Sequence, residues 1–249
     1  MIFNDMSNRE INITFLENQI ELDRILNDYL IESDILSLGI FTEDEEEAVP
    51  EQKENGFITF VKRTTDAILN MLKNLGNAIA SLFNGKEHMS TDDFLASNTG
   101  QTFYVSDIEA INKECDEKIL EGRKMIQAIS RGTNIDDHTV AKFVDGAANF
   151  TSKYGKKAVE AGVIVALAPK IRNAIADKFK LVKSNEDISL RRDASDLHKF
   201  NTHNNPTNAK KEKISKVLHG ISKYVNGFVS KGTEYYNTVK KLGKKNNKK

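Results

Sequence analysis

Apolar residues recur at three- and four-residue intervals along most of the chain, which is the spacing of one face of an α-helix. The first stretch covers about 13–37 and has an acidic outer face, and the second covers 57–83. A short helix is predicted from Ser90 to Ala96 and a short extended segment at 102–105. The remaining predicted helices are 106–130, 136–154, 156–181 with a bend at Pro169, and 209–242. The pattern predicts an all-α protein: an antiparallel helical bundle core with flanking amphipathic helices and a basic C-terminal helix.

The segment 57–83 has the most regular apolar face of the chain. Its apolar positions follow a heptad with Thr65 in the one gap, and they are Ile58, Val61, Ile68, Leu72, Leu75, Ile79 and Leu82. One interpretation is a face that packs in the core or against a second copy of the chain. The other is a membrane-surface helix, because bulky apolar residues stand opposite a weakly charged face of Ser, Thr and Asn.

Two polar stretches divide the chain. Residues 42–56 contain five consecutive acids at 43–47 and end in Gly56, and residues 184–208 have no apolar period. Both are predicted to be linkers. The expected organisation is 1–41 acidic helix, 42–56 linker, 57–105 amphipathic helix with a short helix and loop, 106–183 helical core, 184–208 linker, and 209–249 basic helix with a disordered tail.

The formal net charge of zero hides a strong asymmetry. Residues 1–100 hold 7 basic and 19 acidic residues, whereas residues 151–249 hold 23 and 8. Such segregation indicates ends with different partners, or head-to-tail self-association. The alternative is that the two ends fold onto each other and neutralise internally.

The C-terminal helix concentrates the positive charge, with 12 Lys and 2 Glu over 207–249. Lysine neutralises phosphates without the bidentate base contacts of arginine, so the pattern indicates nonspecific nucleic-acid binding at most. Anionic lipid headgroups and an acidic protein surface, including residues 43–47, remain alternatives. The candidate contact residues for DNA, lipid or a protein surface are Lys210, Lys211, Lys213, Lys216, Lys223, Lys231, Lys240, Lys241, Lys244 and Lys245.

No catalytic or cofactor motif is recognisable. The chain lacks a phosphate-binding loop, a dinucleotide fingerprint, a zinc helix motif and a nucleophile elbow. Cys115 lies on an apolar stripe and is predicted to be a buried small residue. The acids and histidines of 193–203 are interpreted as a polar loop, so no metal, cofactor or small-molecule substrate is predicted. No secretory signal is apparent, and synthesis in the cytoplasm is expected.

In its pattern of helical and charged segments, the chain resembles the internal virion proteins of tailed bacteriophages, which are the prohead core, scaffold-type and packaged head proteins. The features that carry the resemblance are EDEEE at 43–47, FNGKEHMSTDDFLAS at 83–97, ILEGRKMIQAISRGTNIDD at 119–137 and the final KKLGKKNNKK. The resemblance implies a helical, non-enzymatic, self-associating protein of the virion interior. It also implies that the basic C-terminal helix meets DNA or the capsid shell.

The sequence therefore predicts a non-enzymatic structural or assembly protein that self-associates through 13–37 and 57–83 and contacts DNA or the shell. The alternative from another class is a peripheral membrane-active protein that uses 57–83 and 209–242 as interfacial helices.

Overall fold

The computed structural model describes residues 50–83, 90–183 and 208–246. Within these residues the chain forms helices and one two-stranded sheet, which confirms the predicted mostly α-helical fold. The predicted helix at 13–37 lies outside them. In chain order the elements are α2 (Pro50–Ser81), α3 (Thr91–Ser97), β1 (Thr102–Ser106), α4 (Ile108–Ser130), α5 (Asp137–Ala148), β2 (Lys156–Glu160), α6 (Ala161–Lys183) and α8 (Asn208–Asn246).

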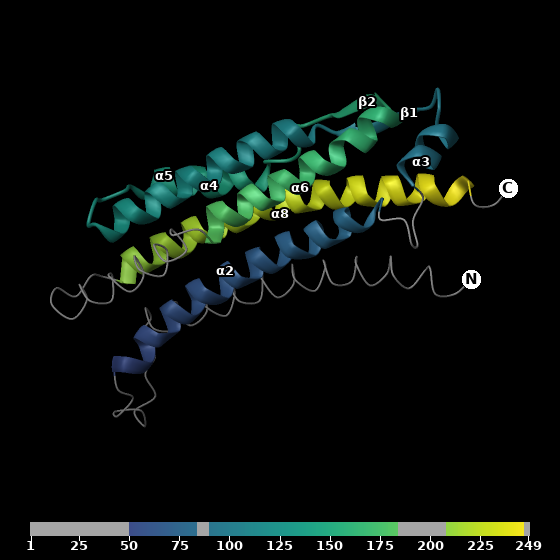
Figure 1. The fold of residues 1–249 in the computed structure, drawn as a ribbon. Coiled ribbons are helices and arrows are strands. Elements are labelled where there is room, and N and C mark those ends of the chain that lie inside the picture. The colour runs from purple at the N-terminus through teal and green to yellow at the C-terminus, as the bar shows by residue number, and fades with distance from the viewer. Residues whose placement is uncertain (1–49, 84–89, 184–207, 247–249) are drawn as a thin grey trace.

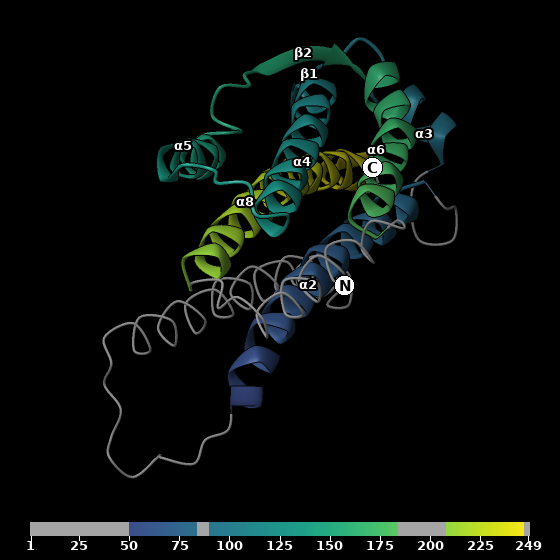
Figure 2. The same cartoon turned by 90° about the vertical axis from the view of Figure 1, so that its left-hand side faces the viewer.

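The basic helix α8 runs through the middle of the bundle (Figures 1 and 2). Helix α4 makes the most extensive contact with it, and α5 and α2 pack along it as well. Helix α6 packs mainly on α2 and only slightly on α4. The helices within 106–183 therefore pack mainly on α8 and α2 and less on one another.

Helices α4, α5 and α8 approach closely at two glycines. A Cβ added at Gly220 of α8 would lie 2.6 Å from the ring of Phe143 in α5. A Cβ at Gly122 of α4 would lie 2.7 Å from the Ile221 side chain of α8 and 2.8 Å from the same Phe143 ring. Only a residue without a side chain fits at these positions, because protein interiors leave almost no empty space.

Side-chain caps start the helices where short-range signals predict them. The Ser90 hydroxyl accepts a hydrogen bond from the Asp93 backbone N–H at 3.2 Å, and the Asp136 carboxylate accepts one from the Thr139 N–H at 2.8 Å. Asp107 caps α4 in the same way, so this helix begins two residues after its predicted start. Each cap satisfies an N–H that the first helical turn leaves without a partner.

Several predicted boundaries are wrong. Helix α2 begins at Pro50, so the last seven residues of the predicted 42–56 linker are helical, and proline suits this first position because its ring presets the backbone angle. Helix α5 ends at Ala148 rather than at 154. Helix α8 reaches Asn246, into the tail that was expected to be disordered.

The extended segment predicted at 102–105 is confirmed as β1, but the helix predicted from 156 begins only at 161. Residues 156–160 instead form β2, which pairs antiparallel with β1 so that Thr102 faces Glu160 and Tyr104 faces Ala158. The alternating burial of β1, with Phe103 buried and Tyr104 exposed, requires an extended backbone whose polar groups need a partner strand. Pairing with β1 therefore overrides the local tendency of 156–160 to be helical.

Candidate functional site

The lysines predicted to contact a partner do not share one exposed face, because most of the circumference of α8 is buried. Apolar and aromatic residues from Ile214 to Val239 are buried, and Ser215 and Ser222 widen the buried arc beyond the apolar stripe. Only Ala209, Lys216, Glu234 and Lys241 are classed as exposed among the described side chains of the helix.

A narrow strip of three lysines remains available on α8. Lys216 and Lys241 are exposed and Lys223 is half-buried. Lys223 follows Lys216 by about two helical turns and precedes Lys241 by about five, so the three share one side of the helix. The exposed Glu234, which pairs with Lys231, lies on the same side. No ion pair joins Lys223 or Lys241 to another residue that the structure describes, and Lys216 pairs with Glu212 at the surface. We call Lys216, Lys223 and Lys241 the lysine strip.

Three other candidate lysines are engaged within the bundle. Lys213 Nζ donates to the Ile135 carbonyl at 2.7 Å and lies 3.2 Å from an Asp137 carboxylate oxygen. Lys231 pairs with Glu234 at 2.6 Å. Lys240 is buried and donates to the Tyr236 hydroxyl at 3.1 Å. Lys213 and Lys240 are thus held by other residues of the fold, whereas Lys231 is half-buried and pairs with a glutamate of its own helix.

The other candidate lysines divide between half-buried positions and positions without described side chains. Lys210 and Lys211 are half-buried near the start of α8. The side chains of Lys244 and Lys245 lie outside the described residues, although their backbone belongs to α8.

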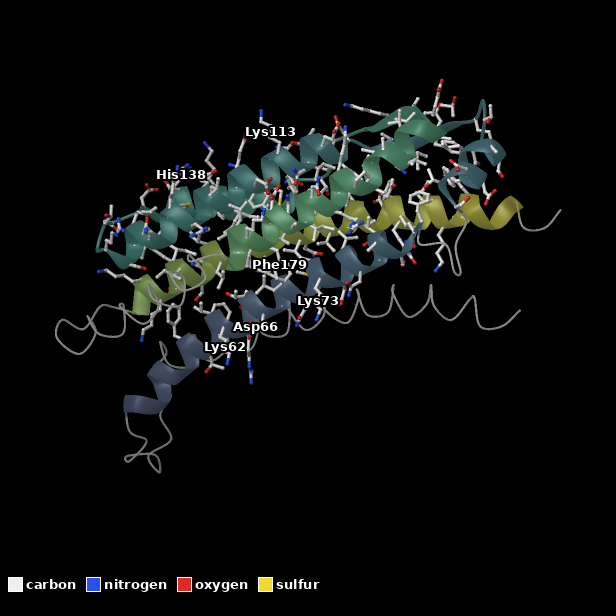
Figure 3. The ribbon with its side chains drawn as sticks, viewed as in Figure 1. Lys62, Asp66, Lys73, Lys113, His138 and Phe179 are labelled. Carbon is white, nitrogen blue, oxygen red and sulfur yellow. The ribbon has the colours of Figure 1, made fainter. Side chains whose placement is uncertain are left out.

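The apolar face predicted at 57–83 is buried in the bundle. Six of its residues are at most 5% exposed, and the side chain of Ile58 lies outside the described residues; the six are Val61, Ile68, Leu72, Leu75, Ile79 and Leu82. Thr65, which fills the gap in the heptad, is also buried and donates to the Val61 carbonyl at 2.8 Å. Figure 3 shows Lys62, Asp66 and Lys73 projecting from α2 on the side away from the other described helices. Within the described residues, the polar side of α2 faces away from the bundle and its apolar face packs into it.

A buried lysine, which the sequence analysis did not single out, joins α4, α6 and α8. Lys178 of α6 is fully buried and donates to the Asp116 carboxylate at 2.7 Å and to the side-chain oxygen of Asn112. Its Nζ also lies 4.1 Å from the centre of the Phe228 ring, a cation–π contact. The sequence does contain a signal for this cluster. Lys178 lies seven residues after Ile171 and three after Ile175, so it falls on the apolar face of α6, where a lysine needs a partner.

Cys115 lies on α4 beside Asp116, and its thiol is buried as predicted. Burial raises the pKa of the thiol to about 12, and the thiol contacts the Tyr224 carbonyl at 3.5 Å. A protonated, enclosed thiol is a poor nucleophile, because the thiolate is the reactive form. This environment suits the predicted role of Cys115 as a small buried residue.

Two acids, the α4 N-cap Asp107 and Glu114 of α4, hold β2 and the segment that leads into it. Asp107 pairs with Lys157, and that hydrogen bond lowers the pKa of the carboxyl group against the opposing effect of burial. Burial raises the pKa of Glu114, but hydrogen bonds from Lys153 and Tyr154 outweigh it, so the pKa of Glu114 is lowered. Both acids are therefore committed to ion pairs that position β2.

A shallow groove of about 350 Å³ lies between α4 and α6. Its walls include Ile108, Asn112 and Asp177, and the Glu109–Lys170 ion pair at 2.6 Å joins the two helices beside it. Two other polar groups of the groove have partners outside its lining: Asn112 accepts from Lys178, and Asp177 pairs with Lys180. The groove offers no converging set of free donors and acceptors of the kind that ligand sites show.

No group of three or more metal-binding side chains occurs within 50–83, 90–183 and 208–246. The polar segment 193–203 lies outside these residues. None of the described helices is long and apolar enough to cross a membrane.

The fold thus defines a helical-bundle protein with one β-ribbon, and the lysine strip contains the two lysines of α8 whose described side chains are exposed, Lys216 and Lys241. No family model matches the chain, and no curated protein or solved structure matches it either.

Proposed function

We propose that this chain is a non-enzymatic assembly protein, an internal virion protein of a tailed phage, that contacts DNA nonspecifically through the lysine strip. The observation that supports this proposal is the presentation of Lys216, Lys223 and Lys241 on one side of a helix that the rest of the bundle holds in place. A rigid helix positions its charges without a further cost for ordering the backbone on binding.

Lysine is suited to phosphate and not to base reading. Its ammonium group acts as a point charge, whereas specific base contacts need the planar fork of arginine or an amide. No arginine occurs in α8. The expected partner is therefore the DNA backbone irrespective of sequence, and the capsid shell is the second partner that the same charges would suit.

The membrane alternative would require the bundle to open. Val61, Ile68 and Leu72 are 2%, 1% and 0% exposed, so the apolar face of α2 already has a partner within the chain. The apolar side of α8 is buried to the same degree. We therefore favour DNA over a lipid surface.

The test is the salt dependence of binding to short DNA duplexes of two unrelated sequences. Each phosphate neutralised adds about 0.9 to the slope of log affinity against log salt, so replacing all three strip lysines by glutamine should reduce the slope by about 2–3. The two duplexes should bind equally well.

The matched control replaces three exposed lysines of α4 and α5, namely Lys113, Lys124 and Lys142, by glutamine. This control changes the net charge equally and should leave the slope within about 1 of the wild-type value. If the two triple variants behave alike, or if the wild-type chain binds neither duplex, the proposal is wrong. Binding to anionic vesicles but not to DNA would instead support the membrane alternative.

A further inference from the structure

The strand β2 forms the outer edge of the β-ribbon. Every residue of β2 is exposed except the half-buried Val159, whereas β1 buries Phe103 and Val105. Figures 1 and 2 both show β2 at the margin of the molecule. The outer edge of β2 is thus open to another strand.

The backbone of this edge has no partner among the described residues. β2 pairs with β1 on one side only, and no turn or cap hydrogen bond of the described chain involves residues 156–160. An exposed edge presents a row of unpaired N–H and C=O groups, which is a template for pairing with a further strand. Edge lysines usually oppose such pairing, so the side chains of β2 decide which partner it accepts.

The sequence of β2, KKAVE, is complementary to itself in an antiparallel arrangement. If two copies pair about Ala158, Lys156 of each copy lies directly opposite Glu160 of the other. Opposite charges that face each other across strands stabilise the pairing, and like charges destabilise it. Lys156 and Glu160 are exposed, and neither forms an ion pair with another residue that the structure describes.

The same register brings the exposed Tyr104 of each copy onto one face of the combined sheet. Tyr104 is 66% exposed and faces Ala158 across the ribbon, where the small side chain leaves its ring uncovered. Pairing about Ala158 creates a row of Tyr104, Ala158, Ala158 and Tyr104 on one face of a four-stranded sheet. A slip by one residue would turn the outer face of one copy toward the inner face of the other, so side-chain alternation excludes that register. A slip by two residues would keep the faces matched but would lose the Lys156–Glu160 pairing, so the charges select the register centred on Ala158.

We propose that the free edge of β2 binds β2 of a second copy of this chain, forming a continuous four-stranded antiparallel sheet centred on Ala158. The contact is isologous, as in most two-fold dimers, because the same five residues contribute from both sides. It is also small, so the dimer is weak. This inference goes beyond the proposed contact with DNA and does not depend on it.

The self-association surface inferred here differs from the one predicted from the sequence. The predicted surface at 57–83 is buried within the chain, and 13–37 lies outside the described residues. The edge of β2 is a described, exposed surface that is complementary to itself.

Charge reversal provides a sharp test by sedimentation equilibrium of the full chain. Lys156→Glu and Glu160→Lys should each weaken the dimer by about tenfold or more, because each places two like-charged pairs in the contact. An equimolar mixture of the two variants should associate again, since opposite charges then face each other at both positions. The control Lys142→Glu on the exposed side of α5 should associate like the wild type.

Disulfide trapping detects the contact even when it is weak. Ala158→Cys places two thiols at directly opposed positions, where Cα atoms lie about 4.5–5.5 Å apart, within the range of a disulfide. The native Cys115 is buried and does not compete. We expect rapid dimer formation on mild oxidation, in contrast to the control Ala141→Cys on the exposed side of α5.

The results separate clearly. Restored association in the mixture, together with faster cross-linking at 158 than at 141, supports the proposal. Single variants that associate like the wild type, a mixture that associates no better than its components, or equal cross-linking at 158 and 141 would overturn it. Because the dimer is measured without DNA, the lysine-strip proposal can fail while this one stands, and the reverse also holds.

Discussion

Removal of one member of the buried Lys178–Asp116 pair should have a cost that depends strongly on which member is removed. Lys178 is fully buried, whereas the Asp116 side chain is 27% exposed. In Asp116→Ala the ammonium group stays buried with only Asn112 oxygens as acceptors. Breaking a buried pair in this way costs about 3–5 kcal/mol, because an uncompensated charge remains in the interior.

The opposite change should be mild. In Lys178→Met the side chain keeps most of its volume and fills the same space beside Phe228. The Asp116 carboxylate is left without its partner, but it can gain water because part of it is already exposed. We therefore expect a cost of about 1 kcal/mol, since replacing buried charge by apolar groups of similar volume is often close to neutral.

The double variant gives the sharpest form of this prediction, because in it the second substitution should raise the free energy of unfolding rather than lower it. Adding Lys178→Met to Asp116→Ala removes the stranded charge, so the double variant should be more stable than Asp116→Ala alone. The free energy of unfolding is measured by urea denaturation followed by circular dichroism, with an unchanged dependence on urea as the sign of an intact fold.

The exposed Asp177–Lys180 pair of the same helix is the control, because both side chains are more than half exposed. Asp177→Ala should cost less than about 1 kcal/mol. Equal losses for Asp116→Ala and Lys178→Met, or a double variant less stable than Asp116→Ala, would refute the argument from the stranded charge. Packing of the lysine stem would then be the main contribution of Lys178.

Two further predictions concern the centre and the edge of the bundle. Gly220→Ala should destabilise the chain by about 1–3 kcal/mol in the same urea assay, because the new methyl group would overlap the Phe143 ring. Gly162→Ala in α6, where nothing lies within 4 Å, should be neutral or stabilising, and a loss at 162 equal to that at 220 would contradict the close-contact explanation. The lowered pKa of Glu114 means that its contribution to stability is complete above its ordinary value of 4.5 and is lost as the pH falls through the lower, folded-state value. The stability difference between the wild type and Glu114→Gln should therefore shrink as the pH falls, and a difference that is constant with pH would show that the carboxylate pairs contribute nothing.

The helix starts were predictable because their signals are local. Ser90 and Asp136 each precede an acidic first turn, and the structure finds both as N-caps. The strand β2 was not predictable in this way, because nothing within 156–160 excludes a helix. Its partner β1 lies far upstream in the chain, and only the packed fold brings the two strands together.

Lys178 shows how a candidate site can be present in the sequence and still be missed. It falls on the apolar stripe of α6, where a lysine is out of place unless a partner neutralises it. The partner residues Asn112 and Asp116 are spaced i, i+4 on α4, beside the predicted buried Cys115. Reading the two helices separately hides the pair, because neither helix alone reveals that they face each other.

The extent to which α8 is buried could not be predicted for the same reason, because one helix alone does not show which other helices pack on it. Its apolar stripe was recognisable, but the number of neighbours that would cover it was not. Gly220 and Ser222 stand beside that stripe and read as neutral positions, yet both are buried because small side chains let α4, α5 and α2 approach closely. Lys240 is buried as well, and its ammonium group donates a hydrogen bond to the Tyr236 hydroxyl. A helix that carries much of the positive charge of the chain thus also forms its core, and among its described side chains only Lys216 and Lys241 are exposed lysines.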